Sequence, residues 1–267
     1  MITFKRTFDP RRIKLLIFDL DGTLIDSRLD LANSVNAMLR HFRRPELPAD
    51  EIVSCVGDGA HMLVLRALGC PQDERFVAEA LAYFLRHYRR HTLDHTRGYE
   101  GITDALADIA APRQGSGRRM AVLSNKPAEL SRGIISGLDL DRFFVAVYGG
   151  DSFATRKPDP LGAREILKEN ATSPDEALMV GDSPNDVLTG RNAGLWTCGV
   201  SYGFAPHALM ESAPDVLVDT PGELADLLRA ANAPAHESPG PPVKLSEKQI
   251  SQVVVERSAP AVKASVT

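Results

Sequence analysis

Residues 13–23 read IKLLIFDLDGT, and this stretch predicts the fold class of the chain. The apolar run at 13–18 is short and unbroken, which is typical of a strand buried on both faces of a parallel sheet. Similar apolar runs recur at 120–123, 144–148, 177–180, 195–200 and 216–218. Helical patterns lie between or after them, at 102–110, 128–137, 160–170, 184–193 and 222–231. This alternation predicts an α/β fold in which helices cover both faces of a parallel sheet.

The segment 26–98 departs from that alternation, because it contains helical patterns and no convincing strand. The patterns lie at 29–42, 60–68 and 74–91. In the first of them, Leu31, Val35 and Met38 fall on one stripe, which is the face that an amphipathic helix buries. We therefore expect an all-helical cap domain at 26–98, inserted into a catalytic core made of residues 1–25 and 99–232. Residues 233–267 are rich in Pro, Ala, Ser and Lys, so we expect a disordered tail there.

The bulk composition argues against several classes of protein. The 267 residues are 43% hydrophobic and 25% charged, as in an ordinary globular protein, and the formal net charge is −4. That charge disfavours nucleic acid as a partner, because its binding needs a basic face. No apolar stretch approaches the roughly 18 residues of a membrane span, and the N-terminus lacks the apolar core of a signal peptide. Three cysteines without a CxxC pair predict neither a zinc site nor a disulfide framework. We expect a cytoplasmic protein that does not bind membranes and is a monomer or homodimer.

Two carboxylates follow the first predicted strand, Asp19 and Asp21. Residues i and i+2 of an extended chain point the same way, so both side chains can face one pocket at the carboxyl end of the strand. In parallel sheets, ligands bind at that end. Two carboxylates held close repel each other unless a cation lies nearby, and oxygen ligands of this kind suit Mg²⁺. Gly22 lets the chain turn away sharply and leaves room for a ligand.

Three further groups are expected near the same edge of the sheet. Asp182 and Asp186 are spaced i, i+4, on one face of the helix that follows the strand at 177–180. Ser124 and Asn125 follow the strand at 120–123 and can hold phosphate oxygens by hydrogen bonds. Lys157 supplies a cation from a proline-rich loop. Each group alone has a plainer interpretation as a helix cap, a turn or a solvated lysine, but their joint occurrence favours a site for metal and phosphate.

These segments together resemble a known family. The stretches FDLDGTLIDS at 18–27, LSNK at 123–126, KPDP at 157–160 and GDSPND at 181–186 are similar to the four ordered motifs of the haloacid dehalogenase superfamily. The resemblance covers roughly residues 13–231. It implies a Rossmann-like core with a mobile helical cap, and a Mg²⁺-dependent phosphatase that acts through an aspartyl phosphate. The second aspartate of the first motif favours phosphoryl transfer over the carbon–halogen cleavage of the founding members.

The family's roles carry over position by position. The resemblance implies that Asp19 is the nucleophile and that Asp21 is the general acid, and then the general base. Lys157 would balance the charge of nucleophile and phosphate. The phosphate oxygens would be held by Thr23 and Ser124, with Asn125 beside them.

The same resemblance implies a ligand set for Mg²⁺. Asp182 would bind the ion directly, together with Asp19 and the backbone carbonyl of Asp21. Asp186 would act either as a ligand or as a support behind the ligands.

Substrate choice in this family lies largely with the cap. Residues 56–68, VGDGAHMLVLRAL, resemble the corresponding segment of phosphoglycolate phosphatases, which implies 2-phosphoglycolate as the substrate. Asp58 is expected to approach the site when the cap closes, and His61 or Arg66 to meet a substrate carboxylate. The plainer interpretation of these three residues is a solvated start of a helix.

Other functions remain open from sequence. A phosphatase of the same design can act on pyrophosphate, a sugar phosphate or a nucleotide. A β-phosphoglucomutase-like mutase shares the core and the helical cap. A non-catalytic phosphate-binding module is the hypothesis from a different class, and the complete acidic set disfavours it. In each case the partner expected is a small phosphorylated metabolite.

Overall fold

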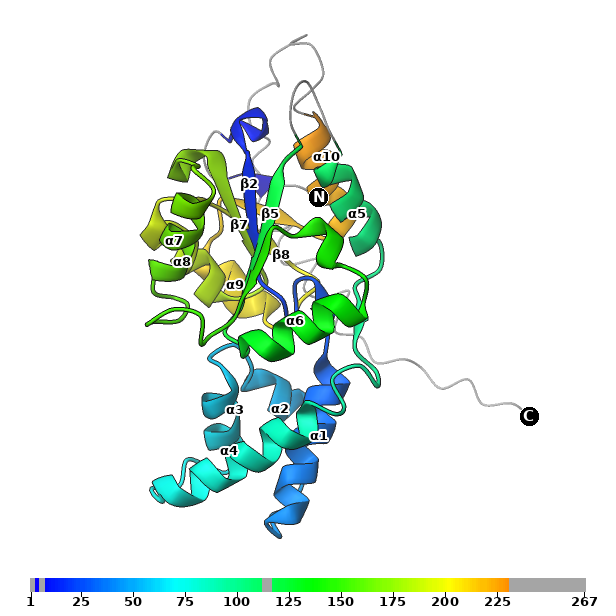
Figure 1. The fold of residues 1–267 in the computed structure, drawn as a ribbon, viewed down its shortest axis with the longest axis vertical. Helices are drawn as coiled ribbons and strands as arrows, with labels where there is room; N and C mark the ends of the chain where they lie inside the picture. The colour runs from blue at the N-terminus through cyan, green and yellow to red at the C-terminus, as the bar shows by residue number, and fades with distance from the viewer. Residues whose placement is uncertain (1–2, 5–7, 112–116, 231–267) are drawn as a thin grey trace, which may run out of the picture. The chain divides into compact units, whose positions relative to one another are not determined.

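The computed structural model describes residues 3–4, 8–111 and 117–230, whose strands form a seven-stranded sheet (Figure 1). The strands are β1 (Thr3–Phe4), β2 (Leu15–Phe18), β5 (Arg119–Leu123), β6 (Ala146–Tyr148), β7 (Ala177–Gly181), β8 (Trp196–Val200) and β9 (Val216–Val218). Their order is β1-β9-β8-β7-β2-β5-β6, and all pairs are parallel except the edge pair β1–β9. The parallel α/β sheet expected from the sequence is confirmed.

Alternate residues of the central strand β2 face two separate apolar layers. Leu16 and Phe18 belong to a cluster with residues of α5 (Ile102–Ala110), α6 (Ala128–Gly137) and α10 (Pro221–Ala230). Leu15 and Ile17 belong to a second cluster with α7 (Leu161–Glu169) and α8 (Pro184–Ala193). These helices therefore cover opposite faces of the sheet (Figure 1). Each fully buried side chain contributes about 1.5–3 kcal/mol, so both layers hold the strand in register.

The strand β2 is paired along its whole length on both edges. Phe18 lies opposite Val122 of β5 and opposite Val180 of β7, so the three strands end at the same level. This register decides where the polar residues that follow each strand are placed. The short helix α9 (Pro206–Ser212) buries Leu209 and lies after β8.

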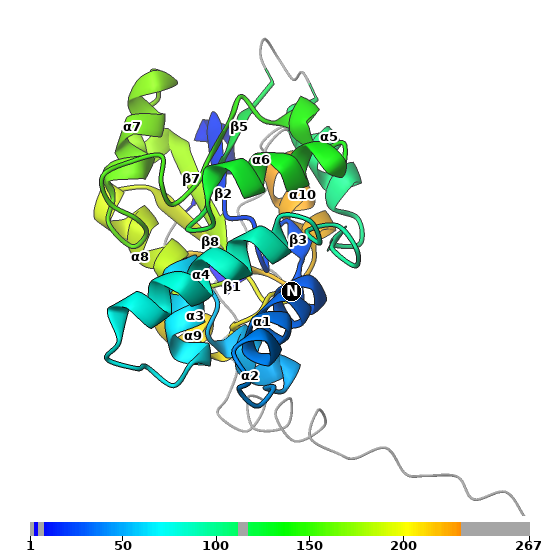
Figure 2. The same cartoon turned by 60° about the horizontal axis from the view of Figure 1, so that its bottom comes forward.

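Four helices lie between the two strands of a small antiparallel ribbon, β3 (Ile25–Asp26) and β4 (Arg97–Gly98). They are α1 (Arg28–His41), α2 (Ala49–Ser54), α3 (Ala60–Ala67) and α4 (Glu74–Tyr88), and they stand forward in Figure 2. They share an apolar cluster that includes Val35, Met38 and Phe84, and Leu130 of α6 joins the same cluster.

Because of such contacts, α1–α4 group with the sheet in one compact unit. The division into a core at 1–25 and 99–232 and a cap at 26–98 stays a prediction. The expected tail at 233–267 lies outside the described residues.

The structure differs from the sequence predictions mainly in short elements. The helices α2 and α9 and the strands β1, β3 and β4 were not predicted, because elements of two to seven residues show no clear periodicity. The helix α4 ends at Tyr88 rather than at 91. The backbone N–H groups of Arg90 and His91 donate to carbonyls three residues back, so the chain continues there in tighter turns than an α-helix. Within the described ranges, no helix has the length and apolar character needed to cross a membrane.

Candidate active site

The site lies where β2, β5 and β7 end. Asp19 directly follows β2, Ser124 directly follows β5, and Asp182 directly follows β7. The backbone N–H of Asp19 still donates to the carbonyl of Val180, at 2.9 Å, so the first acidic residue is held by the sheet itself. The structure therefore brings the strand-end groups to one edge of the sheet.

Three buried carboxylates form a compact acidic group. One oxygen from each of Asp19, Asp182 and Asp186 lies within 4.8 Å of the others. Burial, together with the negative charges of Asp186 and Asp19, raises the pKa of Asp182 to about 8. Burial and the charge of Asp186 raise the pKa of Asp19 to about 6, although the Lys157 ammonium opposes this rise. A divalent cation relieves such repulsion, and carboxylate oxygens are ligands that suit Mg²⁺, so these residues fit that ion.

Lys157 bridges two members of the acidic group. Its Nζ lies 2.8 Å from Asp19 Oδ1 and 2.6 Å from Asp186 Oδ1. Burial works against a charged ammonium, but these two carboxylates outweigh it and hold the pKa of Lys157 above its usual value. Asn125 fixes the backbone of this lysine, because its Oδ1 accepts from Lys157 N and its Nδ2 donates to Lys157 O, both at 3.0 Å.

Asp186 is occupied by three donors. Its Oδ2 accepts from the backbone N–H and from the hydroxyl of Ser183, at 3.1 and 2.7 Å, which caps the first turn of α8. Its Oδ1 accepts from Lys157. Gly181, the last residue of β7, leaves the space for this arrangement, since a Cβ at that position would lie 2.1 Å from Asp186 Cγ. Asp186 therefore orients Lys157 and α8 in addition to its place in the acidic group.

Asp182 is held from two sides. Its Oδ2 accepts from the backbone N–H of Phe204 at 2.6 Å, and its Oδ1 from the hydroxyl of Thr23 at 3.3 Å. Gly22 lies against the same carboxylate. With φ at +82°, it adopts a conformation that favours glycine, and a Cβ there would lie 2.2 Å from Asp182 Oδ2.

Lys126 is a buried residue to which sequence reasoning assigned no role. Its Nζ lies 2.8 and 2.7 Å from the two carboxylate oxygens of Asp21, and 4.8 Å from the ring centroid of Tyr88 in α4. Asp21 also accepts from the hydroxyl of Ser27 at 2.5 Å. Burial lowers the pKa of Lys126, but Asp21 and Tyr88 outweigh it, so the pKa lies above its usual value. The only sequence signal was its position directly after Ser124 and Asn125.

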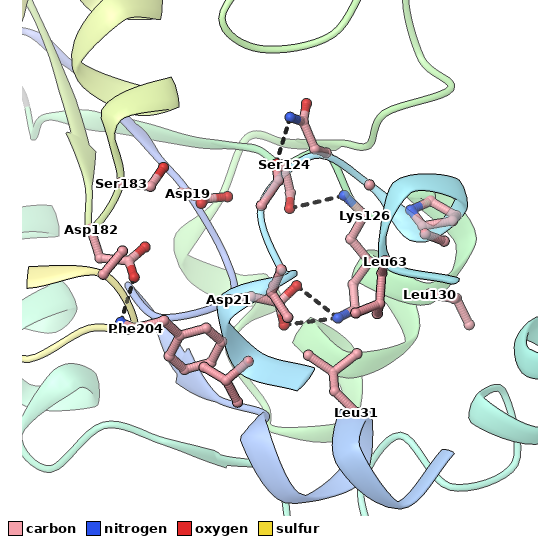
Figure 3. A pocket seen from close by; sticks show the side chains of 18 of the residues that line it. Asp19, Asp21, Leu31, Leu63, Ser124, Lys126, Leu130, Asp182, Ser183 and Phe204 are labelled. Carbon is pink, nitrogen blue, oxygen red and sulfur yellow. Dashed lines mark hydrogen bonds and ion pairs between the residues drawn. The ribbon is translucent and has the colours of Figure 1, made fainter. Parts of the chain in front are cut away.

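A cavity of about 100 Å³ opens onto these residues (Figure 3). This is well below the ~300–1,000 Å³ of pockets for drug-sized ligands. Its polar wall includes Asp19, Asp21, Ser124, Lys126 and Asp182. Its apolar wall comes mainly from α1, α3, α4 and the segment before α9, and includes Leu31, Val56, Leu63, Phe84, Tyr88, Leu130 and Phe204.

The three residues expected to contact substrate from the cap do not line this cavity in the part of the chain described. Asp58 accepts from Arg66 Nη2 at 2.5 Å and from Asn185 Nδ2 at 2.9 Å. Burial raises the pKa of Asp58, but these hydrogen bonds outweigh it and lower the pKa below its usual value. The carbonyl of Gly57 accepts from Asn125 Nδ2 at 2.8 Å. The loop that bears Asp58 is thus bound to the core, and substrate contacts by Asp58, His61 and Arg66 stay predictions.

Residues 16–200 match the model of the haloacid dehalogenase-like hydrolase family. The chain belongs to this family. This hydrolase is 35% identical over 235 residues to phosphoglycolate phosphatase 1 of Pseudomonas aeruginosa, which covers 85% of this chain and 83% of the relative. It is 37% identical over 227 residues to phosphoglycolate phosphatase of Chromobacterium violaceum, covering 82% and 98%.

A solved structure agrees with these relatives. The crystal structure of a "predicted phosphoglycolate phosphatase" from Haemophilus somnus matches with a TM-score of 0.72 at 29% identity, covering 83% of this chain and 99% of that one. The haloacid dehalogenase-like hydrolase described here is therefore an enzyme of the phosphoric monoester hydrolase class.

Proposed function

We propose that this enzyme hydrolyses 2-phosphoglycolate to glycolate and phosphate, with Mg²⁺ and through a phosphorylated Asp19. The observation that carries the proposal is the place of Asp19, which lies on the cavity wall, 2.8 Å from the Lys157 ammonium and next to Asp182. The substrate follows from the names of the relatives and from the small size of the cavity.

In the first step, the carboxylate of Asp19 attacks phosphorus and the bond from phosphorus to the ester oxygen breaks. Asp21 donates a proton to the leaving alkoxide, so glycolate leaves with a neutral hydroxyl group. Phosphoryl transfer depends mainly on alignment and on neutralising oxygen charge. Lys157 supplies positive charge beside Asp19. Ser124, on the cavity wall, would hold a phosphate oxygen, and Thr23, whose hydroxyl donates to Asp182, would hold another.

In the second step, water attacks the phosphorus of the aspartyl phosphate, and Asp21 takes the proton that the water loses. Phosphate leaves and Asp19 is free again. General acid and base help of this kind is worth about 10²–10⁴-fold in rate. Lys126 and Ser27 hold the Asp21 carboxylate at a fixed orientation between the two steps. Bound by Asp19, Asp182 and the main-chain carbonyl of Asp21, Mg²⁺ would supply positive charge to the phosphate oxygens.

Release of phosphate from a panel of esters tests the proposal. The panel contains 2-phosphoglycolate, pyrophosphate, a sugar phosphate and a nucleotide, each with Mg²⁺ and with excess chelator. We expect chelator-sensitive release with 2-phosphoglycolate preferred by at least tenfold, about 1.4 kcal/mol of transition-state discrimination. Comparable rates across the panel would remove the substrate but leave the chemistry. Transfer of phosphate within a sugar phosphate, without release, would favour the mutase.

A further inference from the structure

The charges around the cavity are unevenly distributed. Its walls carry the carboxylates of Asp19, Asp21 and Asp182, whereas Lys126 is the only Lys, Arg or His among the described residues that line it. Lys157 is engaged between Asp19 and Asp186, on the phosphate side. Any second anionic group of a substrate therefore has one cation within the cavity to meet it.

Lys126 stands between the acid–base residue and the cap. Its ammonium contacts both oxygens of Asp21 on one side and the ring of Tyr88 on the other. Leu31, Leu63 and Leu130 line the same cavity as this side chain (Figure 3). To receive a proton from Asp21, the ester oxygen of the leaving alcohol must lie about 2.6–3.2 Å from an oxygen of the Asp21 carboxyl group. A group attached close to that oxygen is therefore brought next to Lys126.

An ammonium has three N–H donors. Lys126 can consequently donate to Asp21 and still hold a carboxylate of the substrate. In 2-phosphoglycolate the carboxyl carbon is joined through a single methylene to the ester oxygen, which suits one cation placed this near to Asp21. Charge-assisted hydrogen bonds of this type are the stronger ones in proteins. A neutral tail would offer no acceptor to the N–H of Lys126 that Asp21 does not use.

We propose that Lys126 is the specificity-determining residue of this enzyme and binds the carboxylate of the leaving alcohol. This rests on the proposed hydrolysis of 2-phosphoglycolate. The alternative is that Lys126 only orients Asp21. The two differ in a measurable way, because loss of an orienting partner slows every ester alike, whereas loss of a carboxylate ligand slows only esters that bear the carboxylate.

The test is the ratio of kcat/KM for 2-phosphoglycolate to kcat/KM for ethyl phosphate, which has a methyl group in place of the carboxylate. We expect the ratio to fall at least tenfold, about 1.4 kcal/mol, in Lys126→Met and Lys126→Gln relative to wild type. Lys126→Arg, which keeps the charge, should retain most of the preference. Thermal melting and circular dichroism show whether each variant is folded, and the Gln variant serves if the Met variant is not.

The rival carboxylate ligand is Arg66, so Arg66→Met is measured alongside. We expect its ratio to equal that of wild type, because Arg66 is bound to Asp58 outside the cavity. An unchanged ratio in the Met and Gln variants of Lys126, with both esters slowed equally, overturns the specificity role. A ratio lowered in Arg66→Met but not at Lys126 overturns it as well. Absence of any preference in the wild-type enzyme refutes the proposed substrate itself.

Discussion

Asn185, in the first turn of α8, donates a hydrogen bond of 2.9 Å to Asp58 Oδ1 in the loop before α3. The same amide lies 3.3 Å from the carbonyl of Gly57. This loop forms part of the cavity wall, and the helix that holds it also carries Asp186. The contact therefore links the position of the loop before α3 to the acidic group at the ends of the strands.

Loss of this link should weaken substrate binding. We expect Asn185→Ala to raise KM several-fold, because the loop at 57–59 loses a partner that holds it over the cavity. Asn192→Ala is the matched control, since Asn192 lies on the same helix but is exposed, and its side-chain amide donates to the carbonyl of Pro158, away from the loop at 57–59. Steady-state kinetics measure KM for both variants. Equal KM values in Asn185→Ala and Asn192→Ala would contradict a role for this contact in holding the loop over the cavity.

Removal of the nucleophile should nearly abolish turnover. We expect Asp19→Asn to lower kcat by at least about a hundredfold, roughly 2.7 kcal/mol, because an amide cannot form the aspartyl phosphate. The control is Asp104→Asn, which removes the same charge from an exposed position of α5. Phosphate release is measured on protein shown to be free of contaminating phosphatase. A variant that keeps more than a few per cent of the activity would rule out Asp19 as nucleophile.

Without metal, the stability of the protein should fall as the pH rises from about 4 to about 8. The pKa of Asp182 is raised from its ordinary value of 3.8 to about 8, so in this range the folded chain binds more protons than the unfolded chain. Stability therefore decreases with rising pH. The raised pKa of Asp19 acts in the same direction up to about pH 6.

Thermal melting across this range, with chelator and with Mg²⁺, measures the effect. We expect Mg²⁺ to raise Tm more at pH 8 than at pH 5, since the ion favours the ionised carboxylates. Asp182→Asn should flatten the pH dependence found with chelator. If Asp182→Asn showed the same change of Tm with pH as the wild type, Asp182 would not be the source of the pH dependence.

A methyl group at Gly22 should lower activity by more than the backbone strain at its positive φ explains. Its Cβ would lie 2.2 Å from Asp182 Oδ2, so Gly22→Ala must displace that carboxylate, and we expect at least a tenfold loss of kcat/KM. Gly69→Ala is the matched control. Gly69 also has a positive φ, +76°, but no atom lies within 4 Å of its Cβ position.

Both variants incur a similar backbone strain, of roughly 1–2 kcal/mol. Comparison of their activities, at temperatures where both are folded, separates crowding from strain. Similar losses of activity in Gly22→Ala and Gly69→Ala would mean that Asp182 tolerates displacement.

Much of the core follows from local patterns in the chain. The apolar runs before Asp19, Ser124 and Asp182 could be identified as buried strands, and parallel strands end at a common edge of their sheet. That rule predicts that the carboxylates at the strand ends lie together. The expectation that Asp182 and Asp186 share one face of a helix was wrong, because Asp182 lies before Ser183, the N-cap of α8. The end of β7, and not the period of the helix, places Asp182 in the acidic group.

The wall of the cavity depended on contacts that no local pattern records. The chain separates Lys126 from Asp21 by 105 residues and Asn185 from Asp58 by 127. Arg66, a plausible ligand by sequence, lies against Asp58 instead, while Lys126 reaches the cavity. Strand ends and helix faces are set by hydrogen bonding and hydrophobic periodicity within a few residues, so the sequence by itself determined the sheet, its order of motifs and the acidic edge. Which cation lines the cavity was decided only by the tertiary structure, since contacts between segments far apart in the chain select the partner of each long polar side chain.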